Sequence, residues 1–533
     1  MKKENNTQTN DSKVYLIGSG ISALASAVYL INDANITPKN IIILEQDGIA
    51  GGACDGSGDP KKGYVIRGGR MHEEHYVCYW DLLSHIPSYE NEFISIKDET
   101  FEFNQRFVSH AQARLIKAGK KVDDSSYGLS ISHQSDMAKL LFTPESLLEN
   151  KRIEDWFAHD FFETNFWYIW STMFAFQKWS SLMEMRRYMK RFIHLVDGLN
   201  HLTGVMRTKY NQYHSVILPI KNYLEKLGVQ FCMNVQVQDI DFKFNEHEKR
   251  AIGLQTLNQG EEENIVLRTN DYLFITNGSI TESTDSGSWN EAAVLKDEKD
   301  SGSWKLWKRI ASKDNSFGNP RVFSENIDLQ KWYSFTATLH DTTFHEYMEN
   351  FSGNVDGTGG LVTITDSNWL MSIVIARQPH FPNQPNDVKI FWGYGLYPDR
   401  TGNCIKKPMS QCNGKEILEE LFYHLNIQTL MQPIMEKGKA NCIPVAMPFI
   451  DSLFMPRSSG DRPDVIPKGA KNFAFIGQFA EVEDDCVFTV EYSVRTAQTA
   501  VYGLFETNKE VIGMNYSIHN PKYLIRAMKS LSS

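Results

Sequence analysis

The sequence lacks the cysteine and charge patterns of several common protein classes. Its seven cysteines are odd in number, scattered, and never spaced as CxxC, which disfavours both a zinc site and a disulfide framework. The 55 basic residues are fewer than the 65 acidic ones, and no basic stripe offsets the formal charge of −10. A phosphate backbone would find little attraction here, so we expect no nucleic-acid partner, and we expect a reducing compartment.

Long apolar runs are missing as well. No stretch approaches the roughly 18 apolar residues of a membrane span. Residues 1–11 are polar and lead straight into a predicted strand, unlike a signal peptide. The sequence therefore predicts a cytoplasmic protein, with peripheral contact to a membrane surface left open. The 533 residues, of which 41% are hydrophobic and 23% charged, are typical of soluble chains and suffice for several domains.

The first recognisable pattern is a strand, a glycine turn, a helix and a second strand. Residues 13–18 form a β-rich run, residues 19–31 repeat apolar side chains at helical spacing, and residues 40–46 form another buried strand. This order surrounds a Gly-x-Gly-x-x-Ala motif, with an acidic residue at the end of the second strand. The pattern is typical of a dinucleotide-binding unit.

Each residue of this motif has a separate role in such a unit. Gly18 permits the tight turn, Gly20 lets a pyrophosphate approach the backbone, and Ala23 allows close helix packing. The helix N-terminus offers unpaired N–H groups and a positive dipole to the phosphates. Glu45 would accept hydrogen bonds from an adenosine ribose, which favours FAD or NAD over a 2′-phosphorylated cofactor.

Two further segments favour FAD. Gly51, Gly52 and Cys54 belong to a glycine-rich segment soon after Glu45, where flavoproteins of the two-dinucleotide type run along their cofactor. Residues 471–505 give a late strand ending at Gly477 and then a long helix, whose N-terminus can stabilise negative charge on the isoalloxazine ring. No second nucleotide fingerprint is found, which disfavours a reductase that recycles NADPH.

We therefore predict an α/β fold with a Rossmann-like FAD-binding domain of the two-dinucleotide flavoprotein type. Because cofactor segments lie near both ends of the chain, this domain is expected to be discontinuous. The inserted substrate domain is expected to be largely helical and mixed α+β. The predicted FAD domain covers 12–82, 200–280 and 465–510, the substrate domain 83–199 and 281–464, and a short C-terminal helical tail 511–533.

The middle of the chain is rich in aromatic side chains. Residues 155–179 include eleven Phe, Trp or Tyr, which fits either the wall of a wide apolar cavity or an ordinary helical core. The next predicted helix, residues 181–196, carries an apolar stripe. Tyr188 lies on that buried side, and basic residues flank it on both sides, but their direction is not set by the sequence.

Several longer runs make the likeness to a family specific. They include KGYVIRGGRMHEEHYVCYWDLL, NFWYIWSTMFAFQKW, EMRRYMKRFIHLVDGL, KYNQYHSVILP and FTVEYSVRTA. The chain resembles the oleate hydratases, fatty-acid double-bond hydratases once called myosin-cross-reactive antigens, from about residue 13 to about 505. The resemblance implies a redox-neutral, FAD-dependent addition of water to the cis-9 double bond of free unsaturated fatty acids, of the type that converts oleate to 10-hydroxystearate.

The resemblance also implies two catalytic residues, and one of them is replaced in this chain. Tyr188 matches the tyrosine proposed as proton donor. The water-activating glutamate of the family directly follows GGR, and that position is Met71, which cannot accept a proton. Three alternatives follow. Glu73 or Glu74 replaces the base, although a structural or flavin-ordering role is favoured for this pair; backbone and flavin alone position the water; or hydration is lost and the protein only binds lipid.

The predicted substrate and flavin contacts complete this set of candidate residues. Val374 and Ala376 replace two hydrogen-bonding side chains of the family's TxNRQPH-like run, whereas Gln378 and His380 remain, so we expect weaker or shifted binding of the carboxylate end. Gln212 matches a pocket glutamine of the family. The further flavin contacts are expected from Arg70, Met71, Val237, Asn277, Gly278, Ser279, Glu483, Phe488 and Thr489.

Two questions stay open at this level. A Rossmann-like unit hosts many chemistries, so a flavin-dependent lipid isomerase or desaturase is an alternative to the hydratase, as is a lipid-binding flavoprotein. Both ends of the chain are shorter than in many hydratases. We therefore expect a monomer, with a homodimer as the alternative.

Overall fold

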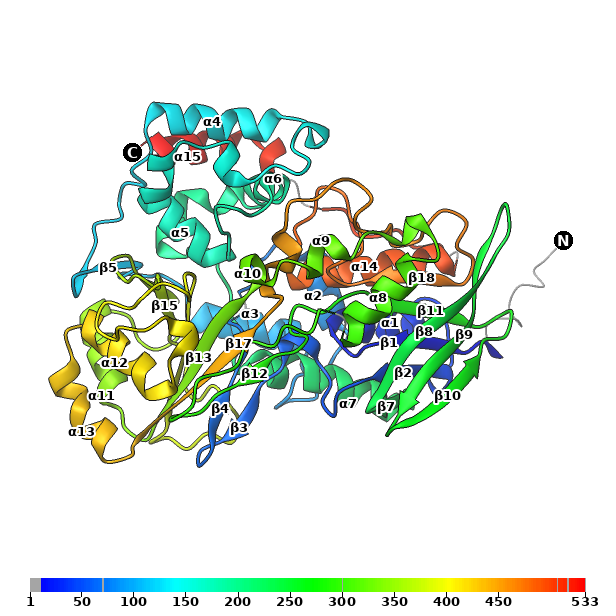
Figure 1. Cartoon of the computed structure of the whole chain (residues 1–533), viewed down its shortest axis with the longest axis horizontal. Helices are drawn as coiled ribbons and strands as arrows, with labels where there is room; N and C mark the ends of the chain where they lie inside the picture. Colours follow the sequence, from blue (N-terminus) through cyan, green and yellow to red (C-terminus); the bar gives the residue numbers. More distant parts are fainter. Residues whose placement is uncertain (1–10, 70, 300, 506, 515–516, 533) are drawn as a thin grey trace.

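A five-stranded parallel sheet organises the part of the molecule predicted to bind a dinucleotide (Figure 1). The computed structural model describes residues 11–69, 71–299, 301–505, 507–514 and 517–532, so Arg70 lies outside the described residues. The sheet has the order β18-β11-β1-β2-β7. Its strands are β1 (Val14–Ile17), β2 (Ile41–Glu45), β7 (Gln230–Met233), β11 (Tyr272–Thr276) and β18 (Phe473–Ile476).

The predicted strand, turn, helix and strand are confirmed. Helix α1 (Ile21–Asn32) follows β1 directly and packs against α14 (Val490–Leu504), the predicted late helix. Strands β1, β2 and β18 are buried along their whole length, as expected where both faces of a parallel sheet are covered. Residues far apart in sequence therefore build one sheet, although the predicted domain boundaries themselves stay a prediction.

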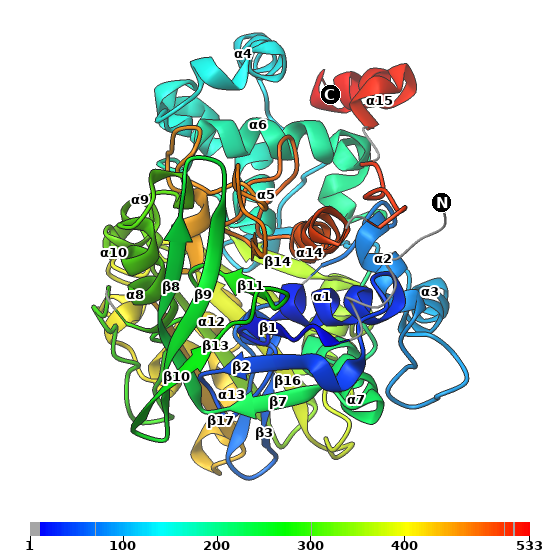
Figure 2. The same ribbon diagram turned by 90° about the vertical axis from the view of Figure 1, so that its right-hand side faces the viewer.

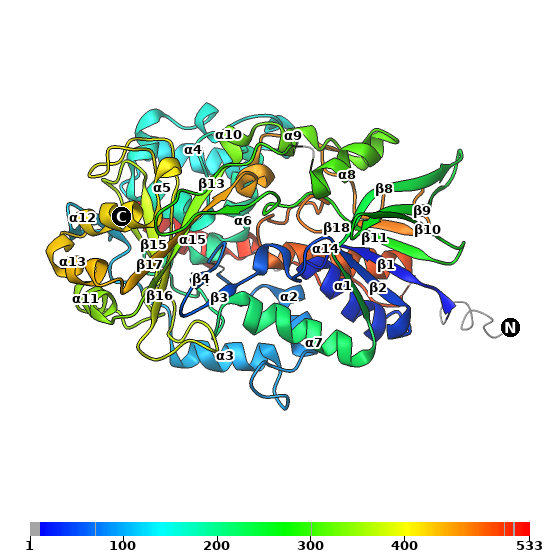
Figure 3. The ribbon, with the colours of Figure 1, turned by 60° about the horizontal axis from the view of Figure 1, so that its bottom comes forward.

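A three-stranded antiparallel sheet lies beside the parallel one. Its order is β10-β9-β8, and Figure 3 shows these strands at the end of the molecule opposite to α11, α12 and α13. Helix α7 precedes the parallel strand β7, and α8 packs against β8. The bounds are β8 (Val235–Phe244), β9 (Lys249–Asn258), β10 (Glu261–Val266), α7 (Leu218–Leu227) and α8 (Gly302–Ala311).

The largest sheet has eight strands in the order β12-β17-β13-β16-β15-β14-β5-β6. A second hydrophobic core lies between this sheet and the helices α11 (Thr343–Ser352), α12 (Gly414–His424) and α13 (Gln428–Glu436). The hairpin β3 (Ser57–Asp59) and β4 (Gly63–Val65) contacts β13 and β17. The eight strands are β5 (Leu115–Lys117), β6 (Lys120–Lys121), β12 (Asp285–Ser286), β13 (Trp332–Leu339), β14 (Leu361–Ile364), β15 (Met371–Val374), β16 (Lys389–Gly395) and β17 (Ala440–Met447).

A helical part lies at the top of the molecule in Figure 2, above α14, and its helix α5 (Asn165–Phe174) contacts β5 and β14 of the largest sheet. This part also contains α4 (Ile131–Phe142) and α6 (Leu182–Arg191), and α15 (Pro521–Ser532) lies against α4 and residues 193–201. The helix predicted for residues 181–196 is too long. It ends at Arg191 because Phe192 leaves helical geometry, and the chain continues as a 3-10 helix, Ile193–His201.

The remaining α-helices lie around this framework. They are α2 (Val77–Ser84), α3 (Ile96–Arg106), α9 (Arg321–Ser324) and α10 (Ile327–Gln330). Within the described ranges, no helix has both the length and the apolar character that crossing a bilayer requires.

Candidate active site

The predicted nucleotide-binding residues meet in one cavity of about 420 Å³ at the carboxyl ends of β1, β2, β11 and β18. We call it the Gly20 cavity. Parallel sheets characteristically bind ligands at this edge. Of the predicted flavin contacts, the following line it: Gly18, Gly20, Glu45, Gly51, Gly52, Cys54, Val237, Asn277, Gly278, Ser279, Gly477 and Phe488.

Four described predicted contacts lie elsewhere. Met71 lines the second cavity described below. Ala23 is buried inside α1, where its small side chain serves helix packing. Glu483 is exposed and lines none of the cavities described below. Thr489 caps the N-terminus of α14, its hydroxyl accepting a hydrogen bond from the Tyr492 amide at 3.2 Å.

The two glycine segments of the Gly20 cavity lie side by side. Gly20 and Gly51 form an isolated β-bridge, and the Gly51 amide donates to the Ser19 carbonyl at 3.1 Å. Gly18 has a φ of +85°, which favours glycine, whereas a side chain at Gly20 would project into open space. Helix α1 starts here with no acidic residue in its first turn. This surface can approach a diphosphate closely.

Glu45 is buried and already bonded at the rim of this cavity. One carboxylate oxygen accepts hydrogen bonds from the Ser19 amide at 2.8 Å and the Ser19 hydroxyl at 2.6 Å, and the other accepts from the Asp47 amide at 2.9 Å. Burial raises its pKa, although these hydrogen bonds oppose the shift. Glu45 therefore holds the glycine loop in shape in addition to facing the cavity.

Unsatisfied polar atoms at the end of β11 indicate a polar ligand. The hydroxyl of Thr276 and both amide atoms of Asn277 are buried, and none has a hydrogen-bond partner within the described part of the chain. Buried polar groups without partners are rare in folded proteins. A dinucleotide in the Gly20 cavity would supply such partners, so the residues present fit this group. Glu282, a buried carboxylate that lines the same cavity, was missed by the sequence analysis.

A second cavity, of about 80 Å³, contains the predicted catalytic positions. We call it the Tyr188 cavity. Met71, Glu73 and Tyr188 line it, together with Thr489, and aromatic side chains that include Phe174 and Phe192 form its walls. Phe488 and Val490 line both this cavity and the Gly20 cavity. The two cavities therefore adjoin at the start of α14.

Tyr188 is fully buried on α6 among aromatic rings. Its hydroxyl donates a hydrogen bond to the Val487 carbonyl at 2.6 Å. Phe174 and Phe176 meet its ring edge to face at 5.1 and 4.9 Å. Burial, and secondarily the nearby Cys486, raise the pKa of Tyr188 well above its usual value. The phenol therefore stays protonated, as a proton donor must, but it is a weak acid.

The cations that flank Tyr188 in sequence are engaged by carboxylates. Arg187 binds Glu145 at 2.8 Å and Glu481 at 2.9 Å. Arg186 contacts Glu145, and Lys190 binds Asp484 at 2.8 Å. These contacts fix α6 against the segment before α14, which holds Tyr188 in place.

Glu73 is buried within a cluster of charged and titratable side chains. One carboxylate oxygen lies 2.9 Å from His75 Nδ1 and 3.3 Å from His194 Nε2, and the other lies 3.6 Å from Arg191. Burial alone would raise the pKa of Glu73, but the hydrogen bonds from His194 and His75 and the charge of Arg191 outweigh it and lower the pKa to about 2. Glu74 points away from the cavity, with 71% of its side chain exposed.

His72, which no sequence motif indicated, lines the Tyr188 cavity next to Met71. Its backbone pairs with Met206, and its ring stacks on Tyr79 with centroids 5.0 Å apart. Its Nε2 lies 3.0 Å from the side-chain nitrogen of Gln212. The only sequence signal was its place directly after Met71.

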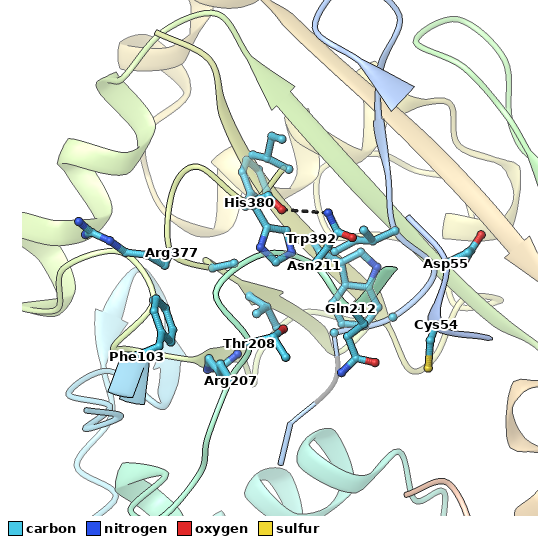
Figure 4. A pocket seen from close by; sticks show the side chains of 18 residues that line it. Cys54, Asp55, Phe103, Arg207, Thr208, Asn211, Gln212, Arg377, His380 and Trp392 are labelled. Carbon is cyan, nitrogen blue, oxygen red and sulfur yellow. Dashed lines mark hydrogen bonds between the residues drawn. The ribbon is translucent and has the colours of Figure 1, made fainter. Parts of the chain in front are cut away.

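A third cavity, of about 50 Å³, holds most of the predicted substrate residues (Figure 4). We call it the Arg207 cavity. Gln212, Val374, Ala376 and His380 line it, along with apolar side chains from β16. It shares Cys54 with the Gly20 cavity and Gly69 with the Tyr188 cavity. Arg207 was not singled out by the sequence analysis.

Gln378 lies outside the Arg207 cavity, contrary to its expected substrate contact. Its amide donates to the carbonyls of Ala376 and Ile390, both at 2.9 Å. Its oxygen accepts from the Ile390 amide at 3.1 Å and from Gln384 at 2.6 Å. Because these bonds use the side chain to tie a loop to β16, we do not carry Gln378 forward as a substrate residue.

The amino-acid sequence of the chain is similar to those of a known enzyme family. A model of the MCRA family matches residues 11–502. The oleate hydratase of Streptococcus pyogenes serotype M49 (strain NZ131) is 40% identical over 534 residues, covering 98% of this chain and 90% of that protein. The linoleate hydratase of Lactiplantibacillus plantarum is 34% identical over 563 residues, covering 98% of each chain.

Solved structures with a similar fold are amine oxidases. A putrescine oxidase bound to putrescine superposes with a TM-score of 0.54 at 13% identity, covering 93% of this chain and 99% of that one. Cyclohexylamine oxidase from Brevibacterium oxydans IH-35A gives a TM-score of 0.51 at 12% identity, with the same coverage. At such low identity these likenesses concern the fold alone, and they confirm the predicted Rossmann-like α/β fold.

Proposed function

The chain belongs to the MCRA family, and from this premise we propose that it is an FAD-dependent hydro-lyase that adds water to the cis-9 double bond of free unsaturated fatty acids. The product is the 10-hydroxy acid. One observation carries the proposal. Met71 and Tyr188, the positions implied for the base and the acid, line one apolar cavity that adjoins both the dinucleotide-type Gly20 cavity and the Arg207 cavity.

The residues that would hold FAD are those of the Gly20 cavity. The glycine loop and the start of α1 would bind the pyrophosphate, and Asn277 and Thr276 would gain the partners they lack. When bound, FAD supplies a polarisable ring as one wall of the substrate site, without net electron transfer. Phe488 and Val490, which line both the Gly20 cavity and the Tyr188 cavity, would be the residues that contact the cofactor and also border the substrate site.

The protonation step falls to Tyr188. An isolated alkene is a poor base, so the phenol must deliver its proton to carbon 9 within a dry site while positive charge develops on carbon 10. A well-placed general acid contributes about 10²–10⁴-fold. Water then adds to carbon 10 and releases one proton, which restores the Tyr188 hydroxyl. The balance is the addition of one water molecule, and no redox partner is consumed.

The incoming water must be held without the usual glutamate. Glu73, with a pKa of about 2, is too weak a base and is fixed by His75, His194 and Arg191, so we assign it a structural role. His72 is the other described residue of the Tyr188 cavity whose side chain ordinarily accepts a proton near neutral pH. We propose that His72, placed by Gln212, orients the water together with backbone groups.

A second candidate function follows from Met71 itself. Loss of the family base would leave a flavoprotein that binds fatty acid but does not hydrate it. One experiment separates the two: the purified, FAD-loaded protein is incubated with oleate in water enriched in heavy oxygen, and the products are analysed by mass spectrometry. A labelled 10-hydroxy acid supports hydration. If oleate binds and the flavin stays intact but no product forms over a long incubation, the protein binds fatty acid without hydrating it.

A further inference from the structure

Arg207 is a buried cation without a partner. The residue as a whole is 9% exposed, and its Nε and Nη2 atoms are fully enclosed without a hydrogen bond. Its guanidinium forms no ion pair and no hydrogen bond with any residue that the structure describes. Only its backbone is engaged, through Asn104, whose side chain bonds both the amide at 2.9 Å and the carbonyl at 2.7 Å.

Burying a charge without a hydrogen-bond or ion-pair partner lowers the stability of the folded protein. Desolvation, and secondarily the neighbouring charge of Arg114, lower the pKa of Arg207 to about 10, so it remains a cation at neutral pH. Arg114 shows how the same fold satisfies a structural arginine. Its guanidinium donates to the carbonyls of Leu361 and Ile169 at 3.3 and 3.1 Å, and to the hydroxyl of Thr363 at 3.1 Å. Arg207 is supported in this way by none of its described neighbours.

The absence of a side chain at Gly360 leaves space for this guanidinium. A side chain at Gly360 would come within 2.6 Å of Arg207 Nη2 and 2.3 Å of Leu202 Cδ1, so only glycine lets the loop close over the cation. Figure 4 shows Arg207 and Thr208 on the segment that borders the cavity, near Phe103. Phe103, Ile390 and Trp392 line the rest of the cavity with apolar surface.

A second unsatisfied group borders the same cavity. His380 Nδ1 is buried without a hydrogen-bond partner in the described chain. Burial, and secondarily the charge of Arg207, lower the pKa of His380 to about 4, so its ring is neutral and can donate one hydrogen bond. A cation, a neutral donor and apolar walls together form a receptor for an anion at the end of a hydrocarbon chain.

We propose that Arg207 binds the carboxylate of the fatty acid, with His380 as its neutral companion. This deepens the proposed function and rests on it, because it takes the ligand to be a long-chain acid. Charge thereby replaces the neutral hydrogen bonds lost at Val374 and Ala376. The hydrocarbon chain extends past Gly69, which lines both this cavity and the Tyr188 cavity, towards the reacting position. The receptor selects free acids over esters, alcohols and thioesters.

The test compares ligands that differ only at the head group. Binding of oleate, methyl oleate and oleyl alcohol to the FAD-loaded full chain is measured by displacement of a fluorescent fatty acid. Wild-type protein is expected to prefer oleate. Arg207→Gln is expected to weaken oleate binding by about 10-fold to 100-fold while changing binding of the neutral ligands by less than about 3-fold. Arg207→Lys keeps part of the preference. Equal preference in Arg207→Gln and wild type would overturn the proposal.

Two further measurements keep this result interpretable. Removing an unpaired buried charge should leave the protein without fatty acid at least as stable as wild type, so the melting temperature of Arg207→Gln separates lost recognition from misfolding. Arg377→Gln tests the other arginine of the cavity, whose guanidinium lies 4.4 Å from the Phe107 ring. If that variant, and not Arg207→Gln, loses the preference for oleate, the proposal is wrong. Selective binding without a hydroxylated product would refute the hydratase function alone.

Discussion

The hydroxyl of Tyr188 donates a 2.6 Å hydrogen bond to the backbone carbonyl of Val487, three residues before the start of α14. This bond joins the candidate proton donor to the segment that borders the Gly20 cavity. It also means that the proton to be transferred is held by the protein until a substrate competes for it. Because Phe488 and Val490 of this segment line the Gly20 cavity, cofactor binding and the direction of the Tyr188 hydroxyl are expected to be coupled.

Tyr188→Phe should therefore separate catalysis from binding. The variant loses the proton donor but keeps the ring contacts with Phe174 and Phe176. We expect kcat to fall by about 10²–10⁴-fold, with flavin content and oleate binding close to wild type. Product formation is measured by mass spectrometry, and flavin content from the absorbance of the bound cofactor. A rate within a factor of a few of wild type would exclude Tyr188 as the proton donor.

Met71→Glu should raise the hydration rate. Met71 is half-buried in the Tyr188 cavity, so a carboxylate there would face the water that adds to carbon 10. A positioned general base contributes about 10²–10⁴-fold, and a gain near the lower end is expected because the surrounding residues are adapted to methionine. Met71→Gln, which has similar size and no basic carboxylate, is the control. Equal rates for the two variants would show that this position does not contact the water.

His72→Phe tests the proposed substitute for the missing base. The phenyl ring can keep the stacking on Tyr79 but cannot accept a proton or form a hydrogen bond with the Gln212 side chain. The hydration rate is expected to fall at least tenfold, and the dependence of kcat on pH near the pKa of an imidazole should disappear. A structural role alone would lower the melting temperature without changing the shape of the pH profile.

Gly20→Ala should block the cofactor and leave the fold intact. Gly20 has φ −68°, which any residue adopts, and its added methyl group would meet no protein atom within 4 Å. The methyl group would instead occupy the space proposed for the pyrophosphate. We expect FAD affinity to fall at least about tenfold while the apoprotein melts as wild type does. Gly18→Ala is the contrasting variant, because a φ of +85° strains the apoprotein as well.

The sequence predicted those features that depend on local patterns. The motif from Gly18 to Glu45 and the late strand and helix after residue 471 are short-range signals, and the structure brings them to one edge of the sheet. Arg207 could not be found in this way. Its surroundings include residues 104 and 360, which are distant from it in sequence and approach it only in the folded chain.

The direction of individual side chains was the second feature that could not be predicted from the sequence. Gln378 matches a family motif, yet its amide is used by Ala376 and Ile390, because β16 passes beside that loop and offers backbone groups there. Likewise, sequence placed basic residues around Tyr188 but could not show that Glu145, Glu481 and Asp484 would bind them. These partners come from segments far from α6 in sequence, where no periodic pattern connects them.

Glu73→Gln should change the pH dependence of stability in a defined direction. The pKa of Glu73 is lowered from 4.5 to about 2 in the folded state, so its contribution is complete above about pH 4.5 and is lost as the pH falls towards 2. A shift of this size corresponds to about 3 kcal/mol.

The pKa of His75 is raised instead, so the contribution of His75 to stability is complete below its ordinary pKa and declines as the pH rises. Urea unfolding between pH 3 and 8 should show both slopes in wild type and in the exposed control Glu74→Gln, but not in Glu73→Gln. If Glu73→Gln retains the acid slope, the carboxylate is not the anchor of this cluster.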